Sequence, residues 1–145
     1  KLSSKIFMAT EYFDEMTQLK ELLATKKQSQ DIVTYHDPCH AKKMQGIAQQ
    51  PRDLIKQNYE IKEMSDSNQC CGFGGITMQT EKYEFAHLAG MPKAAMIKES
   101  NAQIVSSECS ACRIQINNSM HNAGVKTIFK NPIELIADIL NKKDK

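Results

Sequence analysis

The sequence contains no tryptophan, and aromatic residues make up only 6% of its 145 residues. Leucine, isoleucine and methionine must therefore fill most of the core, and the eight scattered methionines suit that role. No apolar run approaches the ~20 residues of a membrane-spanning helix. Neither charge dominates, with 19 Lys and Arg against 17 Asp and Glu, so nucleic acid is not an expected partner.

The chain also lacks a secretory signal and a balanced set of cysteines. Its first residues are mixed and polar, so we expect a cytoplasmic protein with reduced thiols. Because the sequence begins with Lys1 rather than Met, we expect a piece of a longer protein. Five cysteines cannot all pair, and the neighbours Cys70 and Cys71 are unsuited to bridging each other. Metal binding or redox chemistry is the better use for such thiols.

Hydrophobic periodicity predicts an α/β fold of a length that fits one domain. A long helix over residues 4–27 precedes the first strand, and four strand-and-helix units follow. The predicted strands are 31–35, 59–64, 102–106 and 125–129, and the predicted helices are 42–47, 51–58, 80–99 (divided or kinked near Gly90), 108–122 and one opened by Pro132. Such alternation is typical of a Rossmann-like layered domain with a short, mainly parallel four-stranded sheet flanked by helices. We divide the chain into an N-terminal helix and linker (1–30) and a cysteine-rich domain (31–145).

Each group of cysteines comes directly after a predicted strand. Cys39 follows the first strand, Cys70 and Cys71 follow the second, and Cys109 and Cys112 follow the third. Ligands of open parallel sheets bind at the carboxyl ends of the strands, which meet at one edge. We therefore expect all five thiols to converge on one metal centre.

The ligand chemistry favours an iron–sulfur cluster and leaves zinc as the alternative. Thiolates are the soft ligands that select both kinds of site. Cys109 and Cys112 form a C-x-x-C pair, which holds one metal from two sides. Four ligands complete a structural zinc site, whereas five exceed it. The adjacent pair Cys70 and Cys71 suits a centre with several metals, because neighbouring sulfurs then serve different iron atoms.

A glycine-rich stretch follows the adjacent cysteines. Gly72, Gly74 and Gly75 let the backbone pass close to a bulky centre, and their N–H groups are candidate donors to cluster sulfurs. The stretch has neither the phosphate-loop pattern nor the dinucleotide-binding spacing. We therefore assign these glycines to cofactor binding rather than to a nucleotide site.

Two histidines flank the first cysteine. His36 and His40 are candidates for contact with the metal centre, and the alternative is that His36 orients the turn and His40 lies on the surface. Asp37 is interpreted as a turn residue that hydrogen-bonds its own loop. No catalytic residue is assigned.

The arrangement C-x(30)-C-C-G-x(36)-C-x-x-C resembles the cysteine-rich CCG domain. The resemblance extends from about Asp31 to Leu140. The matching stretches are HDPCH at 36–40, Pro51-Arg52, CCGFGG at 70–75, CSAC at 109–112 and NPIELI at 131–136. Such domains occur in heterodisulfide reductase, in iron–sulfur subunits of anaerobic glycerol-3-phosphate dehydrogenase and glycolate oxidase, in the lactate-utilisation iron–sulfur protein, and in certain succinate and fumarate reductases.

The resemblance implies that the five cysteines hold a noncubane [4Fe–4S] cluster, or zinc as in related motifs. It implies an electron-transfer domain that works between a dehydrogenase for glycolate, lactate, glycerol-3-phosphate or a similar donor and a quinone or disulfide. The chain would be the second of two CCG domains in one polypeptide. Its partners would be the other CCG domain, a ferredoxin-like domain, and a flavoprotein dehydrogenase or a membrane quinone-reducing subunit, which could hold it at the cytoplasmic membrane. Two alternatives are a structural zinc module that docks subunits and the active-site domain of a disulfide or quinone reductase.

Overall fold

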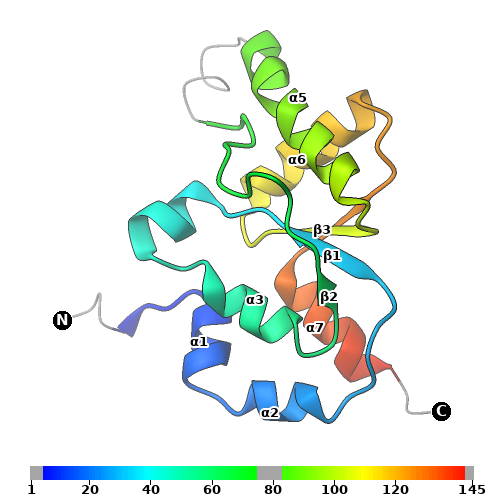
Figure 1. Cartoon of the computed structure of the whole chain (residues 1–145). Helices are drawn as coiled ribbons and strands as arrows, with labels where there is room; N and C mark the ends of the chain where they lie inside the picture. The colour runs from blue at the N-terminus through cyan, green and yellow to red at the C-terminus, as the bar shows by residue number, and fades with distance from the viewer. Residues whose placement is uncertain (1–4, 75–82, 143–145) are drawn as a thin grey trace.

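The computed structural model describes residues 5–74 and 83–142, which form a four-stranded sheet with helices packed on both faces (Figure 1). The strands are β1 (Ile32–Tyr35), β2 (Glu60–Ile61), β3 (Ile104–Ser106) and β4 (Ile128–Lys130). Their order in the sheet is β2-β1-β3-β4, and every pairing is parallel. The predicted α/β layered fold is confirmed, although each strand is shorter than its hydrophobic pattern.

Strands β1 and β3 form the middle of the sheet. Val33 pairs with Ile104, and Tyr35 pairs with Ser106. Because side chains alternate along a strand, Val33 and Tyr35 face one helical layer and Thr34 faces the other. Both faces of these strands are covered, which explains why they are mostly apolar rather than alternating with polar residues.

One helical layer consists of α1 (Ala9–Glu15), α2 (Leu19–Ala24), α3 (Gln49–Ile55) and α7 (Pro132–Asn141), which lie together in Figure 1. These helices share a core cluster with the sheet. Its buried members are Leu23, Val33, Tyr35, Leu54, Ile55, Tyr59, Ile104, Leu135, Ile136 and Ile139. Residues of α2 thus belong to the same core as α3 and α7.

The other layer consists of α5 (Tyr83–Ser100) and α6 (Ser110–Asn122), which pack against each other. A second core cluster lies here. Its buried members are Met64, Cys71, Ile97, Val105, Cys112, Ile116, Met120 and Phe129. Two of the five cysteines are therefore part of the apolar interior on this side of the sheet.

The prediction of one helix over residues 4–27 is wrong. The structure has the shorter helices α1 and α2 instead, separated by Met16–Gln18. The Thr17 hydroxyl donates to the Phe13 carbonyl (2.7 Å) and accepts from the Leu19 N–H (3.2 Å). A threonine side chain that bonds the local backbone competes with helical hydrogen bonds, so the chain turns here.

The predicted division of the helix over residues 80–99 is not observed in its described part. Helix α5 runs unbroken from Tyr83 to Ser100 with Pro92 inside it. Gly90 marks the closest approach to α6, since a Cβ built there would lie 2.1 Å from the Ser119 Oγ. The glycine therefore serves close helix packing rather than a break. The sequence predicts a short helix over residues 42–47. The structure instead has a π-helical turn, η2 (His40–Met44), directly after Cys39.

None of the helices in the described ranges combines the length and the apolarity needed to cross a bilayer.

Core packing can be tested with two leucines of α7. Leu135 is fully buried, whereas Leu140 is 37% exposed. We expect Leu135→Ala to lower the free energy of unfolding by about 2–5 kcal/mol, because the lost side chain leaves a cavity. Leu140→Ala is the matched control and should cost less than about 1 kcal/mol. Urea denaturation followed by circular dichroism measures both, and equal losses would contradict the described core.

Candidate metal centre

The candidate site lies beside β1, where successive strands are added to opposite sides of the sheet. From β1 the first crossover leads to β2 on one side, and β3 then pairs with β1 on the other side. Open α/β sheets bind ligands at the carboxyl ends of the strands beside such a switch point. The His36 N–H donates to the Ser106 carbonyl (2.9 Å), so the pairing of β1 with β3 continues up to the site.

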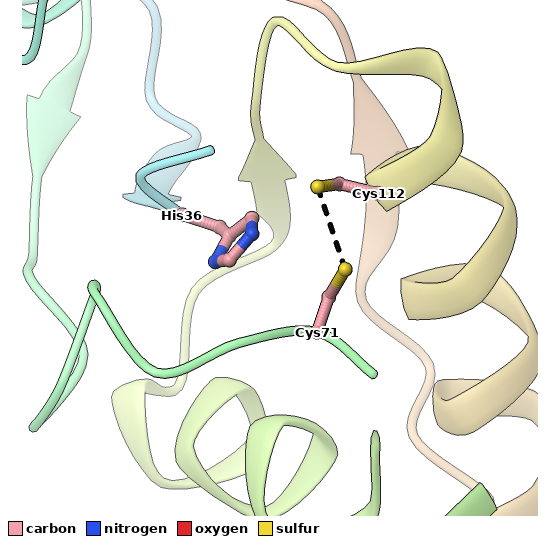
Figure 2. A group of neighbouring side chains, drawn as sticks. All are labelled: His36, Cys71 and Cys112. Atoms are coloured by element: carbon pink, nitrogen blue, oxygen red, sulfur yellow. Dashed lines mark hydrogen bonds between the residues drawn. The ribbon is translucent and has the colours of Figure 1, made fainter. Parts of the chain in front are cut away.

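Three side chains from distant segments meet there. Cys71 comes from the loop after β2, Cys112 from the first turn of α6, and His36 from the residue after β1. The two sulfurs lie 3.4 Å apart, and the ligand atoms of all three residues lie within 4.8 Å of one another (Figure 2). All three are buried. The structure thus brings two predicted ligands and one predicted cofactor contact into a single group.

Among the described residues, the imidazole of His36 has no nitrogen or oxygen partner within hydrogen-bond distance, and its polar neighbour is the Cys71 thiol, whose pKa it lowers. The side chain is 1% exposed, and both ring nitrogens are buried without such a partner. Buried polar groups are nearly always hydrogen-bonded, so an unpaired buried imidazole calls for an explanation. A group held by the neighbouring thiols would supply that partner.

The two buried thiols have opposite acid–base properties. Contact with Cys112 lowers the pKa of the Cys71 thiol against the effect of burial, and His36 acts in the same direction as Cys112. The Cys71 sulfur and burial raise the pKa of Cys112. One thiolate therefore forms readily, while a second negative sulfur in contact with it is unfavourable. A bound cation would relieve this repulsion.

The other three cysteines have different surroundings. Cys109 precedes α6, is half-buried and interacts with the Cys112 thiol. Cys70 is exposed and accepts from the Gly72 N–H (3.4 Å). Cys39 is exposed too, and within the described chain its sulfur lies 3.8 Å from the His40 Nδ1. The structure does not bring Cys39, Cys70 or His40 into the buried group.

The glycines after the cysteine pair have separate surroundings. Gly72 adopts a φ of +92°, and a Cβ there would lie 2.7 Å from the Ala86 carbonyl oxygen. This glycine therefore lets the cysteine loop lie directly on α5. A Cβ at Gly74 would meet nothing within 4 Å. Gly75 lies outside the described residues, and the cofactor role of all three glycines stays a prediction.

Asp37 anchors the loop that carries the first cysteine. It is buried, and its carboxylate accepts from Arg52 Nη1 (2.6 Å), Lys42 Nζ (2.9 Å) and Ser67 Oγ (2.8 Å). Burial alone would raise the pKa of Asp37, but these donors outweigh it and lower the pKa. Asp37 therefore joins three separate segments, which goes beyond the predicted role within its own loop.

Arg52 completes this anchor from helix α3. Its guanidinium also binds both oxygens of Glu63 (2.6 and 3.0 Å) and lies over the Tyr35 ring, 4.6 Å from the ring centre. A planar guanidinium is suited to such forked and stacked contacts. The sequence indicated Arg52 only as part of the family resemblance, because nothing in its local pattern indicates a partner 15 residues away.

The donor set fits a thiolate-bound metal centre. Soft sulfur ligands select zinc or iron–sulfur clusters, and a neighbouring imidazole suits either. The group lies in the apolar core cluster beside α5 and α6, which restricts access of water to the sulfurs. On this chemistry and on the unpaired His36, the residues present are compatible with such a centre.

Comparison with known proteins matches the chain to a family of cysteine-rich domains. The family model described as a cysteine-rich domain, CCG, matches residues 33–117. One subunit of the fumarate reductase (CoM/CoB) of Methanothermobacter marburgensis is 36% identical over 107 residues, which is 72% of this chain and 22% of that protein. An uncharacterized iron–sulfur protein of Methanocaldococcus jannaschii is 34% identical over 75% of this chain and 21% of its own length.

A bacterial relative matches the chain to a similar extent. One subunit of the anaerobic glycerol-3-phosphate dehydrogenase of Escherichia coli is 31% identical over 74% of this chain and 26% of its own length. The chain thus spans about a quarter or less of each of these three relatives.

The Asp37 anchor can be tested by removing its charge. We expect Asp37→Asn to lower the free energy of unfolding by about 3–5 kcal/mol, because Arg52 is left without its buried partner. Asp53→Asn is the control, since Asp53 pairs with Lys56 nearer the surface and should cost at most about 1 kcal/mol. Chemical denaturation at neutral pH measures both variants. Equal, small losses would show that Asp37 is not an anchor.

Proposed function

The chain belongs to the CCG family of cysteine-rich domains, and we propose that it binds an iron–sulfur cluster and passes electrons within an oxidoreductase complex. The observation that carries the proposal is the buried meeting of Cys71, Cys112 and the unpaired His36. The relatives support it, because they include an iron–sulfur protein and subunits of a fumarate reductase and a glycerol-3-phosphate dehydrogenase.

The five cysteines would be the ligands. In this proposal Cys71, Cys112 and Cys109 supply an inner group, and the exposed Cys39 and Cys70 complete the set from the loops after β1 and β2. A cluster, when bound, accepts and releases single electrons. We propose the noncubane [4Fe–4S] type, because five sulfurs exceed the requirement of a single tetrahedral metal.

The protein around the thiols would prepare the site for a cluster. Burial of Cys71 and Cys112 excludes water from the sulfurs, and His36 offers a hydrogen bond to a ligand sulfur. The network of Asp37 fixes the loops that carry Cys39 and the adjacent pair, since it connects them through Ser67. Rigid loops reduce the rearrangement that accompanies electron transfer.

The partners follow from the same proposal. We propose that electrons come from a dehydrogenase for glycolate, lactate, glycerol-3-phosphate or a similar donor and go to a quinone or a disulfide. The names of the relatives support a place in a complex of several subunits. A second CCG domain, a ferredoxin-like domain, a flavoprotein and a membrane quinone-reducing subunit are the proposed neighbours.

Metal and sulfide analysis tests the proposal directly. The anaerobically purified or reconstituted chain should contain several irons and acid-labile sulfides and absorb visible light. Cys112→Ser should lose this iron to background, because a serine oxygen is a poor substitute for a soft thiolate. Ser110→Ala is the matched control, since Ser110 is exposed within the same C-x-x-C loop and should leave the iron content unchanged.

Two results would contradict the proposed cluster. One zinc per chain without sulfide would indicate a structural zinc module instead. A colourless anaerobic protein with no bound metal would reject a metal centre altogether.

The two histidines give a second test. His36→Leu should speed the loss of iron to a chelator by about 10–100-fold, the usual effect of removing a group that supports metal ligands. His40→Leu should keep the wild-type rate, because His40 is exposed and outside the buried group. Circular dichroism confirms that each variant is folded. Equal rates for the two variants would remove His36 from the site.

A further inference from the structure

Lys93 is a buried lysine that is not among the proposed metal ligands. Its side chain, in helix α5, is 0% exposed. The ammonium donates to the Asp66 carbonyl oxygen (2.7 Å) and contacts the Met64 Sδ (3.4 Å). Within the described residues, no carboxylate lies at ion-pair distance from it. A buried charge without a counter-ion is costly, so negative charge is expected close by.

Helix α5 presents Lys93 to the cysteine loop. Gly72 lies directly on this helix, since a Cβ there would come within 2.7 Å of the Ala86 oxygen and 3.0 Å of the Gly90 nitrogen. The Lys93 ammonium reaches the Asp66 carbonyl oxygen (2.7 Å), which belongs to the segment just before Cys70. Its ammonium therefore lies on the side of α5 that covers the cysteine pair.

The groups that act on this ammonium are all negative when ionised. They are Asp66, Cys71, Asp37 and Cys70. Burial lowers the pKa of Lys93, and these four groups oppose that shift. Asp37 is already neutralised by Arg52 and Lys42. Asp66 is exposed, so solvent screens its charge, whereas Cys71 is buried beyond the loop that Lys93 contacts.

We infer that Lys93 is the counter-charge of the metal centre, a positioning residue that stabilises the negative charge of the thiolates and of the reduced cluster. The inference rests on the proposed cluster site. A fixed positive charge in a medium of low polarity favours the state with the extra electron, so Lys93 raises the reduction potential. Through the Asp66 carbonyl it also holds the turn that leads into Cys70.

A redox titration of the reconstituted chain, followed by electron paramagnetic resonance, tests the charge. Lys93→Gln keeps a hydrogen-bond donor and removes the charge. Lys93→Met is a second neutral, unbranched variant in case the first does not fold. We expect each folded neutral variant to shift the one-electron equilibrium at least tenfold toward the oxidised state, which lowers the potential by about 59 mV.

Lys98→Gln is the matched control, because Lys98 is an exposed lysine of the same helix. Its shift should stay below twofold, since solvent screens surface charges. A folded neutral variant of Lys93 that keeps the potential of Lys98→Gln would overturn the inference and leave Lys93 a purely structural residue.

Failure of the proposed cluster can be told apart from failure of this inference. If the wild-type chain takes up no iron and sulfide, the proposed function falls, and Co²⁺ alone then tests Lys93. A Co²⁺ ion held by three or more thiolates is an anionic site, so the wild type should bind it at least tenfold more tightly than Lys93→Gln. Equal affinities, read from the thiolate-to-cobalt absorption band, would overturn the inference.

Discussion

The parallel pairing of β1 with β3 is the constraint on which the rest of this structure depends. It places the residues after Tyr35 and after Ser106 side by side, and the His36 hydrogen bond to Ser106 carries that pairing to the edge of the sheet. The first core cluster includes Val33, Tyr35 and Ile104 of these strands, and the second includes Val105 of β3 on the other face. This central pair of strands therefore allows the loop after β2 and helix α6 to bring Cys71 and Cys112 together.

Two charged anchors hold the loop in front of the adjacent cysteines. Asp37 binds Ser67 on the side of α3, and Lys93 binds the Asp66 carbonyl on the side of α5. A loop without secondary structure of its own would otherwise leave Cys70 and Cys71 poorly placed. The two anchors attach the loop to both helical layers, because Asp37 is bound to Arg52 of α3 and Lys93 belongs to α5.

The five cysteines differ in burial, although all of them belong to one sequence motif. Cys71 and Cys112 lie inside a core cluster, whereas Cys39 and Cys70 are exposed. The proposed ligand set thus combines sulfurs in an apolar setting with sulfurs that solvent reaches. For a redox centre this contrast matters, because solvent exposure and burial both tune the reduction potential.

The sequence by itself determined the fold class, and it predicted a shared edge for the cysteines, since both inferences follow from local signals. Short apolar runs indicated the strands, helical periodicity indicated most helices, and the position of Cys39, Cys70 and Cys109 after strands indicated a shared edge. The break at Thr17 was not predicted, because the two hydrogen bonds of one side chain decided it. Only the tertiary structure decided that His36 is buried without a partner, that Asp37 joins Arg52, and that Lys93 lies against the cysteine loop. These contacts depend on strand order and on packing between segments far apart in the chain, and no local pattern of residues encodes them.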